Sequence, residues 1–450
     1  MFHIIKEIIP PIILLVGFLF AIIGLTNKQR WTLLFIIPFF PLRNVVYKLH
    51  PYPCGKDFID ILLISLLLGL IFNATRQRNG RVFEKSPLNA IAFITIIYTY
   101  ISLWRGYFTL GYFAPFDLSD ERLQFWKNYS IFPILYFLTF NIIKDKKWIW
   151  RTIVVMSLTM VVMDYYQLMQ LSWFSNIASR SKVNGTFVYL GPNEIAAFYS
   201  QYTIILMSLF FVMRSKLLKF ILGGLIWVNI YCIAFLFSRA AYISLVVGCF
   251  FLFAARRRFL LIPLICVVIF WQTLLPQKVK DRINMTTNQY GELDVSSEMR
   301  IIIWEQSLNL FKDSPVLGIG LKTFKYMGFA LGDTHNIYVK FLVEQGIIGF
   351  LLFLILIWKM FRLGWQLYKN GDDPPAKALG LGFAICIVVL LVNNMFGDRW
   401  SYLPLSAYLW IFAGLVARLN TLSNQPNMNK KEILMKEKER IKRMYGIDIK

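Results

Sequence analysis

The hydrophobic residues of this chain fall into long, nearly uninterrupted blocks that are separated by short polar segments. Many of the blocks approach the roughly 20 residues that a helix needs to cross the ~30 Å hydrocarbon core of a bilayer. The pattern predicts an all-α, polytopic membrane helix bundle. The predicted spans are residues 8–25, 31–41, 58–72, 88–103, 129–143, 148–171, 193–213, 218–237, 240–254, 259–275, 336–359, 378–394 and 403–416.

The second block, residues 31–41, leaves the number of spans open. It is too short to cross a bilayer straight, and it contains Pro38 and Pro41. If this block is re-entrant, about twelve helices cross the membrane and both termini lie on the same side. If it spans, there are thirteen, and the N-terminus lies outside. The short length favours twelve.

The charge of the polar segments predicts the orientation of the bundle. The segments at 76–85, 144–151, 214–219, 255–258 and 359–377 are short and basic, which is typical of cytoplasmic loops. Alternation then places four segments outside, namely residues 105–128, 172–192, 276–335 and 397–402. In the largest of these, residues 276–335, seven Lys/Arg balance seven Asp/Glu.

This orientation divides the chain into four parts. Residues 1–275 form an N-terminal transmembrane bundle, 276–335 a large helical extracytoplasmic loop, and 336–417 the C-terminal transmembrane helices. Residues 418–450 form a basic cytoplasmic tail whose charge pattern suits a solvated or surface-lying helix.

Composition removes several alternatives. The net charge of +23 would suggest a nucleic-acid partner in a soluble protein, but here 57% of the residues are hydrophobic and the positive charge orients the loops. We therefore expect membrane lipids and no nucleic acid as partners. The five cysteines form no CxxC pair, so neither a disulfide framework nor a zinc site is indicated. No A-x-A-like cleavage site follows the first block, which indicates a retained helix.

Two arginines of the outer segments are candidates for binding an anion. Arg239 lies at the outer turn between two apolar blocks, where arginine is rare unless it is paired or functional. Arg300 lies on a predicted amphipathic helix whose Ile301, Trp304 and Leu308 share one stripe. The alternatives are a snorkelling arginine that binds a lipid phosphate and a solvated charge, respectively.

His335 is one of only three histidines, and it lies where the largest outer segment meets an apolar block. Asp333 or Thr334 can cap the helix that begins near Asn336, which would place His335 in its first turn. The helix dipole and the arginines both disfavour the imidazolium form, so the ring is available as a base. The alternative is a structural histidine. The preceding "PVLGIGLKTF" predicts a tight turn, permitted by glycine, before the chain returns to the membrane.

Two groups of carboxylates admit a functional and a structural interpretation. Asp117, Asp120 and Glu121 could hold a divalent metal, but a helix start capped by Ser119 is favoured. Asp164 lies inside a predicted span and could belong to a proton relay. It is isolated there, so a hydrogen bond to a neighbouring helix is favoured.

Four stretches, in this order and spacing, resemble the O-antigen ligase and polymerase superfamily of bacterial envelope glycosyltransferases. They are "NGTFVYLGPNEIAAF", "SRAA", "RIIIWEQSL" and "THNIYVKFLVEQGIIG". The matching positions are Gly185, Phe187, Pro192, Asn193, Ala196, Ser238–Ala241, Arg300, Trp304, His335, Asn336, Tyr338, Glu344, Gly346 and Gly349.

The resemblance implies a GT-C-like enzyme of the bacterial inner membrane whose active site faces the periplasm. Its donor would be a glycan linked to undecaprenyl pyrophosphate, transferred with inversion, without cofactor or metal. His335 would activate the acceptor hydroxyl, while Arg239 and Arg300 bind the pyrophosphate. Supporting roles would fall to Asn336 and Tyr338, which orient His335 or the sugar, to Asn193, which lines the cleft, and to Trp304.

Three functions remain open on the sequence alone. A ligase that transfers a finished chain to lipid A-core or another surface acceptor is slightly favoured, because the outer segments are of modest size. A polymerase that extends a lipid-linked chain is the alternative within the superfamily. A lipid-linked glycan flippase or transporter is the alternative from another class. It is disfavoured because the polar candidates cluster on one outer face rather than at mid-membrane.

Overall fold

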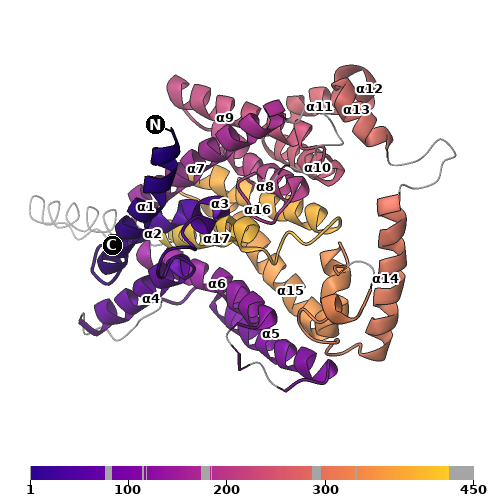
Figure 1. Ribbon diagram of the computed structural model, residues 1–450. Helices are drawn as coiled ribbons and strands as arrows, with labels where there is room; N and C mark the ends of the chain where they lie inside the picture. The colour runs from indigo at the N-terminus through magenta and orange to yellow at the C-terminus, as the bar shows by residue number, and fades with distance from the viewer. Residues whose placement is uncertain are drawn as a thin grey trace, which may run out of the picture.

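The computed structural model describes residues 2–76, 84–113, 116–117, 119–173, 183, 185–285, 295–329 and 332–424, and the regular secondary structure in these ranges is entirely helical (Figure 1). Eight of the described helices are long and apolar enough to cross a membrane, which confirms the predicted all-α polytopic fold. They are α4 (Phe58–Arg76), α5 (Asn89–Thr109), α7 (Lys146–Trp173), α9 (Lys216–Phe235), α10 (Arg239–Arg256), α15 (Ile337–Asn370), α16 (Pro374–Asn394) and α17 (Leu403–Asn424).

Other helices coincide with the remaining predicted spans. Three of them, α1 (Phe2–Gly24), α6 (Glu121–Ile142) and α8 (Pro192–Phe210), are long. The block at 31–41 forms only the short helices α2 (Gln29–Ile36) and η1 (Ile37–Phe39), which together are too short to cross a bilayer straight. The predicted span 259–275 is divided into η3 (Arg258–Leu260), α11 (Leu261–Ile269) and α12 (Trp271–Leu274).

The centre of the bundle is formed by α8, α16 and α17, which lie between the N-terminal helices and α15 (Figure 1). Aromatic side chains fill this centre: the Tyr202 hydroxyl of α8 donates to the Leu405 carbonyl of α17 at 2.6 Å, and its ring packs 5.6 Å from that of Tyr408. Arg418 is only 4% exposed and bonds Glu84, and α17 remains buried as far as Leu419 and ends at Asn424. Residues 425–450 lie outside the described residues.

The large outer segment contains α13 (Gln277–Asn284), α14 (Val295–Asp313) and η4 (Phe324–Tyr326). The view in Figure 1 shows α14 at the edge of the molecule, beside the loops that precede α15. Its buried side is formed by Ile303 and Ser307, whereas Ile301 and Leu308 of the predicted stripe are exposed. An apolar stripe without protein cover fits the predicted position of this helix on the membrane surface.

Helix α15 is broken at Gly346, whose φ of 64° and ψ of −170° are not helical. The loop after α14 replaces the helical hydrogen bonds that the break removes. Ile319 donates to the Val343 carbonyl at 2.9 Å, and Ile347 donates to the Pro315 carbonyl at 2.9 Å. Broken helices are tolerated at membrane depth only where other protein groups satisfy the freed backbone. The loop therefore lies in the break of α15 and supplies the backbone hydrogen-bond partners that the helix lacks there.

The tight turn predicted for "PVLGIGLKTF" contains two positions, Gly318 and Gly320, where the structure requires glycine. Gly318 has a φ of 68°, and a Cβ atom there would lie 2.5 Å from the carbonyl carbon of Glu344. Gly320 has a φ of 109°, and its Cβ would lie 2.1 Å from the backbone of Gly106. Only glycine combines these backbone angles with such close approach.

We expect Gly346→Ala to destabilise the protein by about 1–3 kcal/mol or more, the cost of a strained backbone position. The new Cβ would lie 2.2 Å from the Val316 carbonyl oxygen, which cannot retreat without losing the insertion. Thermal unfolding in detergent measures the effect. Gly224→Ala in α9 is the matched control, because it has open space and should be neutral or slightly stabilising. Equal melting temperatures for the two variants would contradict the prediction.

Candidate active site at the outer helix ends

The starts of α8 and α10 and the end of α16 meet at one end of the bundle. Ser244 of α10 donates to Asn393 Oδ1 of α16 at 3.0 Å, and Asn393 Nδ2 donates to Ser200 Oγ of α8 at 3.0 Å. Each serine lies within about two turns of the first residue of its helix. Arg239, the first residue of α10, and Asn193, the second of α8, therefore belong to the same end of the bundle.

The start of α15 lies at this end as well. The Tyr338 hydroxyl, in the first turn of α15, donates to the Leu391 carbonyl near the end of α16 at 2.7 Å. Tyr338 thus ties two helices together, and its hydroxyl is occupied by that bond. The four helix ends hold the sequence candidates Asn193, Arg239 and His335 on one face of the protein.

His335 lies before α15 and not in its first turn, which corrects the predicted position. Its φ of 50° is incompatible with a helix, and the helix starts at Ile337. The N-cap is Asn336, whose Oδ1 accepts from the amides of Tyr338 at 3.0 Å and Val339 at 3.4 Å. Asparagine is among the best N-cap residues, so it takes the place predicted for Asp333 or Thr334. His335 is consequently presented on an irregular turn.

Helix α14 packs against this turn through Trp304. The indole Nε1 of Trp304 donates to the Thr334 carbonyl at 2.9 Å, directly before His335. Arg300 lies one turn earlier on the same helix, and its charge acts on the His335 imidazole. The structure thus brings Arg300, Trp304 and His335 together from two separate sequence motifs.

The electrostatic environment of His335 keeps the ring neutral. Burial lowers its pKa from the ordinary value. Arg300 and Arg399 lower the pKa further, because each would repel the imidazolium, while Asp333 and Glu194 act in the opposite direction. A half-buried histidine that is unprotonated near pH 7 can accept a proton from a hydroxyl group.

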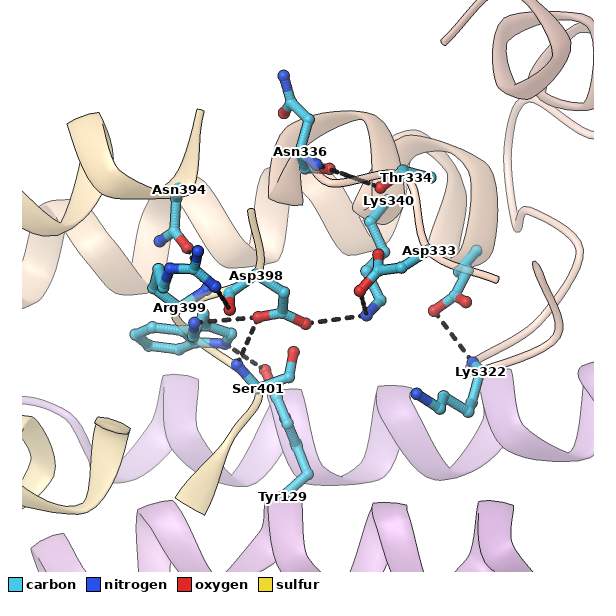
Figure 2. Close-up of polar contacts among 12 residues, drawn as sticks. Tyr129, Lys322, Asp333, Thr334, Asn336, Lys340, Asn394, Asp398, Arg399 and Ser401 are labelled. Carbon is cyan, nitrogen blue, oxygen red and sulfur yellow. Dashed lines mark hydrogen bonds and ion pairs between the residues drawn. The ribbon is translucent and has the colours of Figure 1, made fainter. Parts of the chain in front are cut away.

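Arg399, which the sequence interpretation missed, is a second cation whose charge acts on His335. It lies in the α16–α17 loop and is 6% exposed. Its Nη1 forms an ion pair with Glu194 of α8 at 2.6 Å. Its amide donates to Asn394 Oδ1 at 2.8 Å, and Figure 2 shows these two residues side by side. The argument that singled out Arg239, an arginine outside against the positive-inside rule, applies equally to the "GDRWSY" loop.

Lys340 joins the histidine turn to the arginine loop, as Figure 2 shows. Its Nζ lies 2.9 Å from Asp398 Oδ2 and 3.7 Å from Asp333 Oδ2, and both the Lys340 and Asp398 side chains are almost completely buried. Asp398 Oδ1 also accepts from the amides of Trp400 and Ser401. Burial raises the pKa of Asp398, but Lys340 and these hydrogen bonds together hold it below the usual range. The two loops are thereby fixed relative to each other.

Glu344, another residue of the recognised motif, has a structural contact. Its Oε2 accepts from the Lys322 amide at 3.0 Å, and its carbonyl accepts from the Gly320 amide at 2.8 Å. Glu344 therefore anchors the loop that inserts at Gly346.

The carboxylates of the first outer segment form a helix start. Asp120, and not Ser119 as predicted, caps α6: its Oδ1 accepts from Arg122 at 2.8 Å and Leu123 at 3.3 Å. Asp117 accepts from Ser119. Within the described residues, no group of three or more His, Cys, Asp or Glu side chains is placed to hold a metal ion.

Asp164 contacts a neighbouring helix. With the Asn229 amide oriented to satisfy its surroundings, this side chain of α9 donates to Asp164 Oδ1 at 3.0 Å. That arrangement fits the interpretation favoured from the sequence.

Comparison with known proteins gives two matches. The family model of the O-antigen ligase matches residues 224–354, a region that contains Arg239, Arg300, Trp304 and His335. A protein of Rickettsia conorii that is provisionally named a polysaccharide ligase is 24% identical over 214 residues, which cover 44% of this chain and 45% of the relative. The match thus spans less than half of either chain.

Proposed function

We propose that this chain, whose residues 224–354 match the family model of the O-antigen ligase, transfers a glycan from an undecaprenyl-pyrophosphate-linked donor to an acceptor hydroxyl at the outer face of the bacterial cytoplasmic membrane. The observation that carries this proposal is His335, a half-buried base whose pKa is lowered by burial and by the charges of Arg300 and Arg399. A base beside fixed positive charges suits a reaction in which a hydroxyl loses its proton and an anion departs.

In this mechanism His335 accepts the proton of the acceptor hydroxyl as its oxygen attacks the anomeric carbon of the donor sugar. The bond from this carbon to the pyrophosphate oxygen breaks, undecaprenyl pyrophosphate leaves with both electrons, and the configuration inverts. Arg239 and Arg300 bind the pyrophosphate, since a guanidinium can engage two phosphate oxygens at once. Arg399 contributes charge, although its Nη1 already bonds Glu194. These cations take the place that a metal would otherwise have.

The acceptor is lipid A-core or another surface acceptor in our preferred version, and a second lipid-linked glycan in the polymerase version. Purified protein in proteoliposomes, supplied with lipid-linked donor and each acceptor in turn, tests both. We expect release of undecaprenyl pyrophosphate and an inverted glycosidic bond, with unchanged rate in EDTA. Movement of the donor across the bilayer without any new bond would assign the protein to the transporters and overturn the proposal.

We expect Arg239→Ala and Arg300→Ala each to lower kcat/KM for transfer about 10²–10³-fold, the scale of a lost donor to developing negative charge. Lysine at either position should restore the rate only in part, because it cannot form a bidentate hydrogen bond with two phosphate oxygens. Arg151→Ala, at an exposed cytoplasmic arginine, is the control. Normal transfer by both alanine variants would show that Arg239 and Arg300 do not bind the pyrophosphate during the reaction.

The pH dependence of transfer should report the lowered pKa of His335. The active form is the neutral base, so kcat/KM should stay constant as the pH falls to about 6.5, the ordinary histidine value, and decline only below it. Asp333→Asn removes a charge that raises this pKa, so the midpoint of its profile should move to lower pH. A midpoint above about 7 in the wild type would contradict the assignment of His335 as base.

A further inference from the structure

A cavity lies at the end of α5 and the start of α6, apart from the four helix ends that hold His335. It has a volume of about 580 Å³ and is lined by Tyr107, Tyr112, Phe113, Asp120, Arg122 and Tyr326. This volume falls within the range of small-molecule sites. Aromatic rings and one ion pair make up most of its wall, which is an unusual combination at a helix start.

Arg122 is the central residue of this cavity. Its guanidinium lies 3.6 Å from the ring centre of Tyr107, 5.6 Å from that of Tyr112 and 5.3 Å from that of Tyr326. The residue is 6% exposed, and Nη2 lies 3.5 Å from Asp120 Oδ2. Its buried Nη1 has no hydrogen-bond partner among the described residues.

An unpaired, buried guanidinium N–H is costly, so an oxygen from a bound molecule is expected to satisfy it. The wall also shows which oxygen fits. A phosphate would be attracted by the Arg122 guanidinium but repelled by the Asp120 carboxylate beside it. Neighbouring sugar hydroxyls can accept from the arginine and donate to the carboxylate at the same time. The C–H faces of a sugar ring pack on aromatic rings such as Tyr112 and Tyr326.

We propose that this cavity binds sugar units of the glycan substrate at a distance from the reacting bond. The identity of the ligand rests on the proposed function, whereas the cavity and its chemistry do not. The position supports the proposal, because Lys322 connects the two regions. Its Nζ lies 4.8 Å from the ring centre of Phe125, one turn after Arg122, and its amide bonds Glu344 of α15. A glycan of several units held at His335 could therefore extend along α6.

Direct binding tests the proposal without requiring transfer. The probe is the oligosaccharide released by mild acid from the lipid-linked glycan of the host cell, titrated calorimetrically into the purified protein. We expect Tyr112→Ala and Arg122→Gln to bind it at least about tenfold more weakly, a loss of ~1.4 kcal/mol. Tyr112 is 61% exposed, so its substitution leaves the core intact. Phe116→Ala is the matched control, because Phe116 is 81% exposed in the same segment and does not line the cavity.

The outcomes separate this site from the reaction itself. His335→Ala should bind the oligosaccharide with unchanged affinity. Loss of binding in Tyr112→Ala and Arg122→Gln would support the site even if His335→Ala still transferred glycan. Wild-type affinity in Tyr112→Ala and Arg122→Gln would overturn the proposal, as would a wild-type protein that does not bind the probe. If Arg122→Gln lost copurifying anionic phospholipid but kept the oligosaccharide, the cavity would be a headgroup site and the proposal would be wrong.

Discussion

Replacing His335 by alanine is expected to reduce glycan transfer by about 10²–10⁴-fold, the usual contribution of a general base. The physical reason is the neutral state of the ring, which burial and the charges of Arg300 and Arg399 maintain. Alanine cannot accept the proton of the acceptor hydroxyl. Single-turnover rates in proteoliposomes measure the effect, and binding of the lipid-linked donor should persist.

Two further variants make this prediction specific. His335→Gln keeps a hydrogen-bonding side chain but no useful basicity, so it should be nearly as inactive as His335→Ala. His50 is the control: burial, followed by Arg43 and Lys56, lowers its pKa as well, yet it belongs to a different loop. His50→Ala should transfer normally. Near-normal transfer by His335→Gln would reduce the role of His335 to positioning, and loss of donor binding in His335→Ala would make it a ligand of the pyrophosphate.

The fold was predictable because crossing a bilayer leaves a signal in each segment by itself. Blocks such as 58–72 and 378–394 need no partner to be recognised, and they became α4 and α16. The break in α15 illustrates the limit. Gly346 was noticed as part of a motif, but the insertion that explains it depends on Pro315 and Ile319, which pair with α15 through backbone atoms. Backbone pairing leaves no trace in hydropathy.

In the candidate site, too, residues in local motifs could be predicted, whereas residues that depend on distant partners could not. His335, Arg300 and Trp304 could be predicted because short motifs carry them, and the structure places them together. Arg399 and Lys340 were missed because their significance depends on partners far away in the sequence, Glu194 and Asp398 respectively. The first of them could have been found, since the outer "GDRWSY" segment carries an arginine against the positive-inside rule. Lys340 could have been flagged as a charge within an apolar block.

The Lys340–Asp398 ion pair is expected to be the most sensitive point for stability in the candidate site. Lys340→Met should destabilise the protein by about 3–5 kcal/mol, because it leaves the buried Asp398 carboxylate without its cation. The consequence extends to the site, since Asp398 holds the loop of Arg399 and Lys340 also lies 3.7 Å from Asp333, two residues before His335. Thermal unfolding in detergent measures the loss, and transfer by the folded fraction should also fall.

The double variant Lys340→Met/Asp398→Asn separates charge from packing. Asparagine retains an oxygen that can accept from the Trp400 and Ser401 amides, so the loop keeps its hydrogen bonds while the unpaired charge disappears. We therefore expect the double variant to be more stable than Lys340→Met alone. Lys325→Met provides the matched control, because the Lys325–Glu121 pair at 2.6 Å is exposed and should contribute no more than about 1 kcal/mol. If Lys340→Met and Lys325→Met shifted the melting temperature equally, the buried pair would not be what fixes the two loops of the site.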